Sequence, residues 1–235
     1  MKKRCRSSRY SLFFVIFYFN SLLWGCASME APTLKATNLI RDSAEALKIF
    51  SQHRDLMSYS DYLKDAAGVI IFPDVMKAGW FFAAEAGNGV LLARDLDGKW
   101  SDPTFHTLAA ASVGLQVGVQ DTSVILILRN ESALQSVLKY QGKLGADIGA
   151  TIVYAGVGAE AATTANLGAD IIAFAAPVLG VYIGSSLEGS VLAVRRDMNE
   201  GVYGRGATPE AILSGKFQTT IAEKLKSALT NAASR

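Results

Sequence analysis

The sequence predicts an α+β fold, with a mainly antiparallel β core and helices at the N- and C-terminal ends. Strand-like runs that are short and linked by turn residues fill the chain from Gly68 to about Asp197. Segments with helical spacing come before and after them. Half of the 235 residues are hydrophobic, which argues against disorder and suffices for one sizeable core. We expect that core to be a curved sheet, a sandwich or barrel-like.

The first 25 residues have the layout of a bacterial export signal. A basic start without acids precedes an apolar run from Leu12 to Trp24, which is too short for a comfortable membrane span. Leu23-Trp24-Gly25-Cys26 resembles a lipobox, although Trp24 is bulky for its place. We therefore expect a signal peptide over 1–25, a lipidated tether over 26–32 that starts at Cys26, and a single domain over 33–235. The alternative is an uncleaved anchor helix with an incidental Cys.

Removal of the signal reverses the charge of the chain. The full chain has 23 Lys and Arg against 21 Asp and Glu, and its first 25 residues hold five basic residues and no acid, so 18 against 21 remain and the net charge falls from +2 to −3. Nucleic-acid binding requires a basic surface, so we expect no nucleic-acid partner. Cys5 leaves with the signal and Cys26 carries lipid, so no disulfide is expected.

The first elements of the domain follow from spacing and turn residues. Apolar residues at helical spacing predict an amphipathic helix from Thr33 to about Met57, and Ser58 with Asp61 resembles the capping box of a second helix. The run "GVIIF" then predicts a buried strand, which Pro73 ends because proline has no N–H to donate. "AGWFFAAEA" and "VLLARD" predict two strands, joined in a hairpin by Gly87-Asn88-Gly89.

The second half of the chain predicts further strands and three helices. "SVGLQVGVQ" alternates strictly and predicts a strand over 112–120 with one glycine-lined face. Asn130 is placed to cap a short helix, Thr208-Pro209-Glu210 opens another, and a last helix covers about Phe217 to Ala232. The remaining strands are expected at 122–129, 147–156, 169–176, 180–187 and 189–197.

Motifs for catalysis are missing from the sequence. His53 and His106 are the two histidines, and neither lies in a pattern that would hold zinc. Residues 156–161 fit G-x-G-x-x-A, but the acid that a dinucleotide site needs about 20 residues later is absent. We therefore expect no enzyme, no cofactor and no metal site.

Several blocks in order resemble a known family. They are "AAGVIIFPDVMKAGWFFAAEAGNGVLLAR", "VGLQVGVQDTSVILIL", "LGADI", "GSSLEGSVLAVRRDMNEGVYG" and "EAILSG". Together they resemble the SYLF lipid-binding domain family, in its branch of exported bacterial lipoproteins, over about Leu34 to Lys226. The resemblance implies membrane-lipid binding, with a phosphoinositide preference in eukaryotic members, some of which also bind actin.

The resemblance and the lipobox lead to one functional expectation. We expect a non-catalytic lipoprotein, anchored through acyl chains such as palmitate, that binds anionic phospholipid at the periplasmic face of the outer membrane. Ser28, two places into the mature chain, fits export to that membrane. Actin is not expected as a partner of an envelope protein. The alternative is an envelope scaffold that binds a protein partner and uses lipid only as its anchor.

Basic residues near the tether are the expected head-group contacts. The first helix supplies Lys35, Arg41, Lys48 and Arg54, and Lys77 is added from the turn after Pro73. Acids on the same helix oppose this reading, so the helix is alternatively a packed cover for the sheet. Lys77 is alternatively a solvated turn residue or a partner of Asp74.

Overall fold

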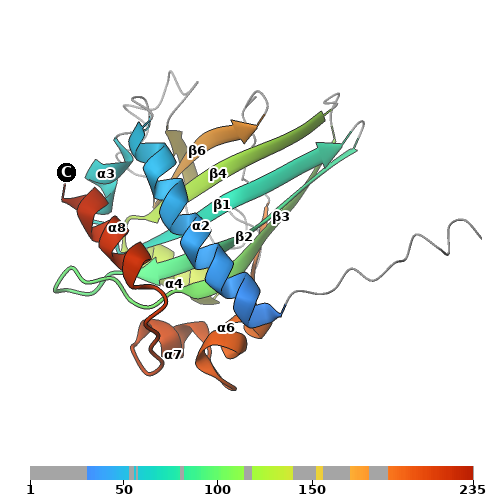
Figure 1. Ribbon diagram of the computed structural model, residues 1–235. Helices are drawn as coiled ribbons and strands as arrows, with labels where there is room; N and C mark the ends of the chain where they lie inside the picture. Colours follow the sequence, from blue (N-terminus) through green and yellow to red (C-terminus); the bar gives the residue numbers. More distant parts are fainter. Residues whose placement is uncertain are drawn as a thin grey trace, which may run out of the picture. The chain divides into compact units, whose positions relative to one another are not determined.

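A computed structural model describes residues 31–52, 56, 58–79, 82–113, 118–139, 152–155, 170–179 and 190–234 (Figure 1). The predicted signal peptide, most of the tether, Cys26 and Arg54 lie outside these residues, as does the strand expected at 180–187. The described elements, in chain order, are α2 (Pro32–Gln52), α3 (Tyr59–Leu63), β1 (Gly68–Gly79), β2 (Phe82–Ala93), β3 (Thr104–Val113), β4 (Gly118–Leu128), α4 (Glu131–Lys139), β5 (Ile152–Ala155), β6 (Ile171–Leu179), β7 (Val191–Val194), α6 (Arg196–Tyr203), α7 (Pro209–Leu213) and α8 (Glu223–Ala233). None of the described helices is long and apolar enough to cross a membrane.

The strands form a single sheet, and the expected α+β class with helices at both ends is confirmed. In the described part of the chain seven strands lie in the order β5-β6-β4-β1-β2-β3-β7. β5 runs parallel to β6, and every other neighbouring pair is antiparallel. β5 and β7 are the two edges of this order, so the described sheet is open rather than closed into a barrel.

Helices cover the two faces of the sheet, because alternate side chains of each strand point to opposite faces. On one face Val69 and Ile71 of β1 pack in a core with α2, α3, α6 and α8. On the other face Ile70 and Phe72 pack with α4. Figure 1 shows α2 lying across the strands of the first face.

Pro73 does not end a strand, contrary to the sequence prediction. β1 continues to Gly79, and its register with β2 shifts between the pairs Ile71–Val90 and Asp74–Asn88. Between these two pairs β1 advances by three residues and β2 by only two. The extra residue in β1 is a β-bulge. A bulge tolerates proline because its residues leave the hydrogen-bond ladder. The Ser123 hydroxyl of β4 donates to the Pro73 carbonyl at 2.6 Å and ties the bulge to the neighbouring strand.

The predicted hairpin at Gly87-Asn88-Gly89 is also wrong, because β2 runs straight through it. A Cβ atom on Gly87 would lie 2.5 Å from the Asp74 carbonyl oxygen, and one on Gly89 would lie 2.5 Å from the Phe72 ring. The two glycines therefore face the bulge of β1 and let it approach β2 closely. β1 and β2 form one long antiparallel ladder, which runs from the pair Gly68–Ala93 to the pair Gly79–Ala83.

The strand expected over 112–120 is two strands. Val113 ends β3 and Gly118 begins β4, and β2 and β1 lie between these strands in the sheet. The glycine-lined face expected around Gly114 falls on residues outside the described part. Alternation alone did not reveal the break, because both strand ends continue the same pattern.

The helix boundaries match the sequence prediction where a cap marks them. Ala133 N–H donates to the Asn130 side chain at 2.8 Å, and Ala211 N–H donates to Thr208 Oγ1 at 3.3 Å, so both predicted caps are confirmed. Ser58 makes no capping hydrogen bond, so the predicted capping box is wrong. α2 extends from Pro32 to Gln52, and most of the remainder of its predicted range, residues 53–57, lies outside the described residues. α8 begins at Glu223, later than expected.

Candidate functional site

Lys77 lies inside strand β1 and not in a turn. It stands opposite Glu85 of β2, with 4.0 Å between Nζ and Oε2, and the two side chains are 14% and 11% exposed. The readings of Lys77 as a solvated turn residue or as a partner of Asp74 are therefore wrong. A mostly buried cation whose charge is offset by a facing carboxylate has little to offer a lipid head group.

The basic residues of α2 lie along its solvent side. Arg41 is 3.0 Å from Asp42, and Lys48 is 2.8 Å from Glu45. All four side chains are about half to two-thirds exposed, and such pairs contribute only about 0–1 kcal/mol. Lys35, in the first turn, has no ion-pair partner within the described ranges. The structure thus brings Lys35, Arg41 and Lys48 onto one helix but leaves Lys77 apart from them.

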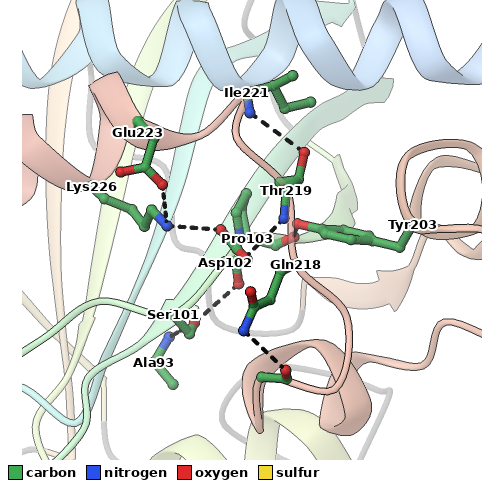
Figure 2. A network of polar contacts seen from close by, with 11 residues as sticks. Ala93, Ser101, Asp102, Pro103, Tyr203, Gln218, Thr219, Ile221, Glu223 and Lys226 are labelled. Atoms are coloured by element: carbon green, nitrogen blue, oxygen red, sulfur yellow. Dashed lines mark hydrogen bonds and ion pairs between the residues drawn. The ribbon is translucent and has the colours of Figure 1, made fainter.

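A second feature, which the sequence did not reveal, is a hollow of about 970 Å³. It lies between the turn that joins β2 to β3 and the segment that joins α7 to α8 (Figure 2). Its cations and carboxylates are equal in number, and hydroxyl groups and one tryptophan complete the wall. The lining residues are Ala93, Arg94, Asp95, Lys99, Trp100, Ser101, Asp102, Leu213, Ser214, Gly215, Gln218, Thr219, Thr220, Glu223 and Lys226.

Asp102 and Lys226 form the buried centre of this wall. Lys226 Nζ donates to Asp102 Oδ1 at 3.0 Å, and the two side chains are 22% and 7% exposed. Thr219 N–H donates to the other oxygen of Asp102 at 3.1 Å, while Lys226 also pairs with Glu223 at 2.7 Å. Burial alone lowers the pKa of Lys226, but its hydrogen bonds to Glu223 and Asp102 outweigh burial and raise the pKa. Lys226 is therefore charged at neutral pH.

The neighbours of this pair are also held by hydrogen bonds. Tyr203 donates its hydroxyl to the Pro103 carbonyl at 2.7 Å, and burial and the charge of Asp102 raise the pKa of the phenol. Ser101 Oγ accepts from Ala93 N–H and donates to the Asp102 carbonyl, each at 3.0 Å. Such a network is suited to holding the C-terminal segment on the sheet and to offering a rigid polar wall.

Trp100 is the least satisfied group of the hollow. The Arg94 guanidinium lies 5.6 Å from its ring centre, within cation–π range. Its indole N–H is buried and has no hydrogen-bond partner among the described residues. Arg94 itself donates to the carbonyls of Leu63, Lys64 and Gly98.

Titratable groups elsewhere do not assemble into a reactive site in the part of the chain that the structure describes. His106 of β3 is buried beside Thr104 Oγ1 at 2.9 Å, and burial lowers its pKa to about 4. His53 lies outside the described residues. Across the described ranges, no cluster of three or more His, Cys, Asp or Glu side chains is placed to hold a metal ion.

This hollow could not be predicted from the spacing of residues in the sequence. Asp102 and Lys226 are 124 positions apart, and the sheet and α8 bring them together only in the folded chain. The dipeptide Asp97-Gly98, which is typical of a turn, comes shortly before Trp100 and Asp102, but it does not indicate a pocket. Taken with the fold, the site defines an α+β domain with an open sheet, a basic solvent side on its first helix and a polar hollow beside its last.

Comparison with known proteins gives the family. The family model described as "Las17-binding protein actin regulator", named Ysc84, matches residues 109–232, more than half of the chain. The chain belongs to this Ysc84 (SYLF) family, as the sequence resemblance predicted. Protein YSC84 of Saccharomyces cerevisiae is 35% identical over 193 residues, which are 81% of this chain and 41% of that protein.

Other relatives carry similar names. LAS seventeen-binding protein 3 of Saccharomyces cerevisiae is 33% identical over 193 residues, covering 81% of this chain and 41% of the relative. SH3 domain-containing YSC84-like protein 1 of Homo sapiens is 27% identical over 191 residues, covering 80% and 54%. The chain thus spans about two fifths to just over half of the length of these relatives.

The family corrects one expectation about partners. Actin was not expected, but the matching family is described as an actin regulator, and relatives are named for binding Las17. That expectation is wrong. It rested on the export signal alone, and no surface feature of the domain itself argued against an actin-linked partner.

Proposed function

We propose that this chain is a non-catalytic, membrane-anchored lipoprotein whose Ysc84-family domain binds anionic phospholipid. The anchor is Cys26, and the site of action is the periplasmic face of the outer membrane. The observation that carries the proposal is the position of α2, which begins at Pro32 only six residues after Cys26. Its solvent side carries Lys35, Arg41 and Lys48.

The electrostatics of α2 favour weak, salt-sensitive binding. Near an anionic surface each basic residue contributes roughly 1 kcal/mol. Arg41 and Lys48 are held only by exposed pairs with Asp42 and Glu45, and such pairs exchange readily for phosphate. We leave Lys77 out of the binding surface because Glu85 offsets its charge in a mostly buried pair.

Vesicle flotation with charge variants tests this surface. In the domain of residues 27–235, we expect Lys35→Gln, Arg41→Gln and Lys48→Gln together to weaken binding to phosphatidylglycerol vesicles by about 100-fold, at roughly five-fold per charge. The matched control is Lys99→Gln, Lys216→Gln and Lys224→Gln, which removes three exposed cations from elements other than α2. Equal losses in both variants, at unchanged melting temperature, would contradict a site on α2.

A protein-binding role is the second candidate. Relatives are named for binding Las17, and the β2–β3 turn exposes Leu96 completely beside the polar hollow. A single exposed leucine is common on protein surfaces, so the names of the relatives carry this candidate, and Leu96 supplies the residue to vary. Co-sedimentation with filamentous actin, with Leu96→Ser as the variant, tests this role. Pelleting that is lost in the variant supports it, and absence of pelleting for both proteins contradicts direct actin binding.

A further inference from the structure

We propose that the domain faces the membrane with the end where α2 meets α6, and that its partner there is a lipid surface bearing phosphate. This inference rests on the proposed function, since it takes Cys26 as the acylated residue. The surface consists of Leu34 and Lys35 of α2, Arg196 of α6 and Arg205 of the following loop. We refer to these four residues as the anchor-end surface.

The length of the tether limits which part of the domain can reach the bilayer. Six residues lead from Cys26 to Pro32, and even fully extended they span at most about 20 Å. α2 has 21 residues and is therefore about 30 Å long. The first turn of α2 stays near the membrane in every arrangement, whereas its last turn can lie far from it.

α6 packs directly against this first turn. Thr33 Oγ1 donates to the Gly201 carbonyl at 2.9 Å, and a Cβ atom on Gly201 would lie 3.2 Å from the Thr33 nitrogen. Figure 1 shows α6 beside the start of α2. Gly206 N–H donates to Glu200 Oε1 at 3.0 Å, which holds the loop that carries Arg205 on α6. Arg205 is therefore fixed near the point where the tether enters.

The charge of this end is opposite to that of the domain. Lys35, Arg196 and Arg205 are partly or fully exposed, and none of them has an ion-pair partner among the described residues. The nearby acids are engaged, because Asp197 pairs with Arg195 at 2.7 Å and Glu200 accepts from Gly206. Four basic residues, Arg195 included, against these two acids and Glu30 of the tether give +1, whereas residues 26–235 sum to −3.

An exposed apolar side chain completes the surface. Leu34 is 52% exposed in the same turn as Lys35. A leucine beside cations is typical of helices that rest in the interface of a membrane, where the apolar side chain enters the head-group region. Leu34 is in the first turn, whereas α8 packs on α2 and α3, and Figure 1 shows its C-terminal end beside α3, at the far end of α2. If the anchor-end surface contacts the membrane, Asn231 of α8 therefore points away from the bilayer.

The orientation is measured on the lipidated full-length protein, reconstituted in vesicles. An environment-sensitive fluorophore is placed on Thr37→Cys, one turn from the anchor end, or on Asn231→Cys, and spin-labelled lipids quench it. In phosphatidylglycerol vesicles at low salt we expect strong quenching at position 37 and background quenching at 231. High salt, or neutral phosphatidylcholine vesicles, should return position 37 toward background. Equal quenching at both positions overturns the proposal, as does quenching at 37 that is the same in neutral vesicles.

Charge variants separate this inference from the proposed function. Arg196→Gln with Arg205→Gln should abolish the quenching at position 37 that depends on anionic lipid. The matched control Lys99→Gln with Lys224→Gln should leave it unchanged. If both pairs act alike, the anchor-end surface is wrong. If the unlipidated domain fails to float with anionic vesicles, the proposed function fails; if it floats but position 37 is not quenched, only this inference fails.

Discussion

Gly89 shows how one residue decides the path of two strands. A Cβ atom there would lie 2.5 Å from the Phe72 ring and 2.7 Å from the Ile71 carbonyl oxygen. The ring can turn, but the carbonyl belongs to the backbone of the bulge and cannot move without disturbing the strand. The conformation of β1 around Pro73 thus depends on a missing side chain in β2.

Gly89→Ala should therefore destabilise the domain. We expect a loss of about 1–3 kcal/mol in the free energy of unfolding, the usual cost of overpacking. Ala84→Val, at an exposed position of the same strand, is the matched control and should cost less than about 0.5 kcal/mol. Chemical denaturation measures both. Equal free energies of unfolding for Gly89→Ala and the wild type would show that the backbone of the bulge can shift at little cost.

Asp121 gives the domain a pH dependence. Burial, a hydrogen bond to Asp74 and the charge of Asp74 raise the pKa of Asp121 to about 6 from 3.8. The folded state thus favours the protonated form, so this contribution to stability is present below about pH 4 and is lost as the pH rises through 6. The carboxyl is partly solvated, which limits the effect to about 1 kcal/mol.

Asp121→Asn should remove this dependence. We expect the variant to melt a few degrees above the wild type at pH 7.5 and at the same temperature at pH 4, since about 1 kcal/mol shifts the midpoint by that amount. Asp97→Asn, in an exposed turn, is the control. A variant that melts lower than the wild type at pH 7.5 would mean that the charged form of Asp121 stabilises the fold.

At the scale of the elements, α8 is held on the sheet by its contacts with α2 and by the pair Asp102–Lys226. Asp102 also accepts from Thr219 in the segment before α8. Removing one member of a fully buried ion pair leaves the charge of the other uncompensated, and this lowers the free energy of unfolding by about 3–5 kcal/mol. Lys226 is partly exposed, so the cost here should be smaller.

We expect Asp102→Ala to cost about 2 kcal/mol and to speed amide hydrogen exchange in α8 before the rest of the domain. Lys48→Ala, which breaks an exposed pair on α2, should cost less than about 0.5 kcal/mol. Exchange followed by mass spectrometry gives both results. Uniformly faster exchange across the sheet and α8 would show that the pair supports the whole core rather than one helix.

The elements differ in how well the sequence predicted them, and the reason is physical. The caps at Asn130 and Thr208 are local, since each capping side chain accepts from a helix N–H three residues later in the sequence, and both were predicted correctly. The continuity of β1 through Pro73 and of β2 through Gly87-Asn88-Gly89 depends on how one strand faces the other. When Pro73 and the glycines of β2 were considered separately, they therefore predicted the ends of strands. In the structure both strands continue, and β1 has a β-bulge at this place.

At the scale of the whole molecule, the fold class and the family could be predicted from the sequence, whereas the candidate functional site could be predicted only in part. Helices at both ends and a mainly antiparallel sheet followed from periodicity, because periodicity reflects burial directly. The hollow around Asp102 and the contact of α2 with α6 each join distant parts of the chain, and the pairing of Lys77 with Glu85 depends on the register of β1 with β2. Neither spacing nor composition contains those contacts.

The central claim, that the domain itself binds anionic phospholipid, is tested most directly by flotation of wild-type residues 27–235 without the acyl anchor. Vesicles of phosphatidylglycerol and of phosphatidylcholine are compared at low and high salt, with the melting temperature checked in each buffer. We predict binding to phosphatidylglycerol at low salt, loss of binding at high salt, and no binding to phosphatidylcholine. A folded domain that stays in solution with every vesicle at low salt would contradict it.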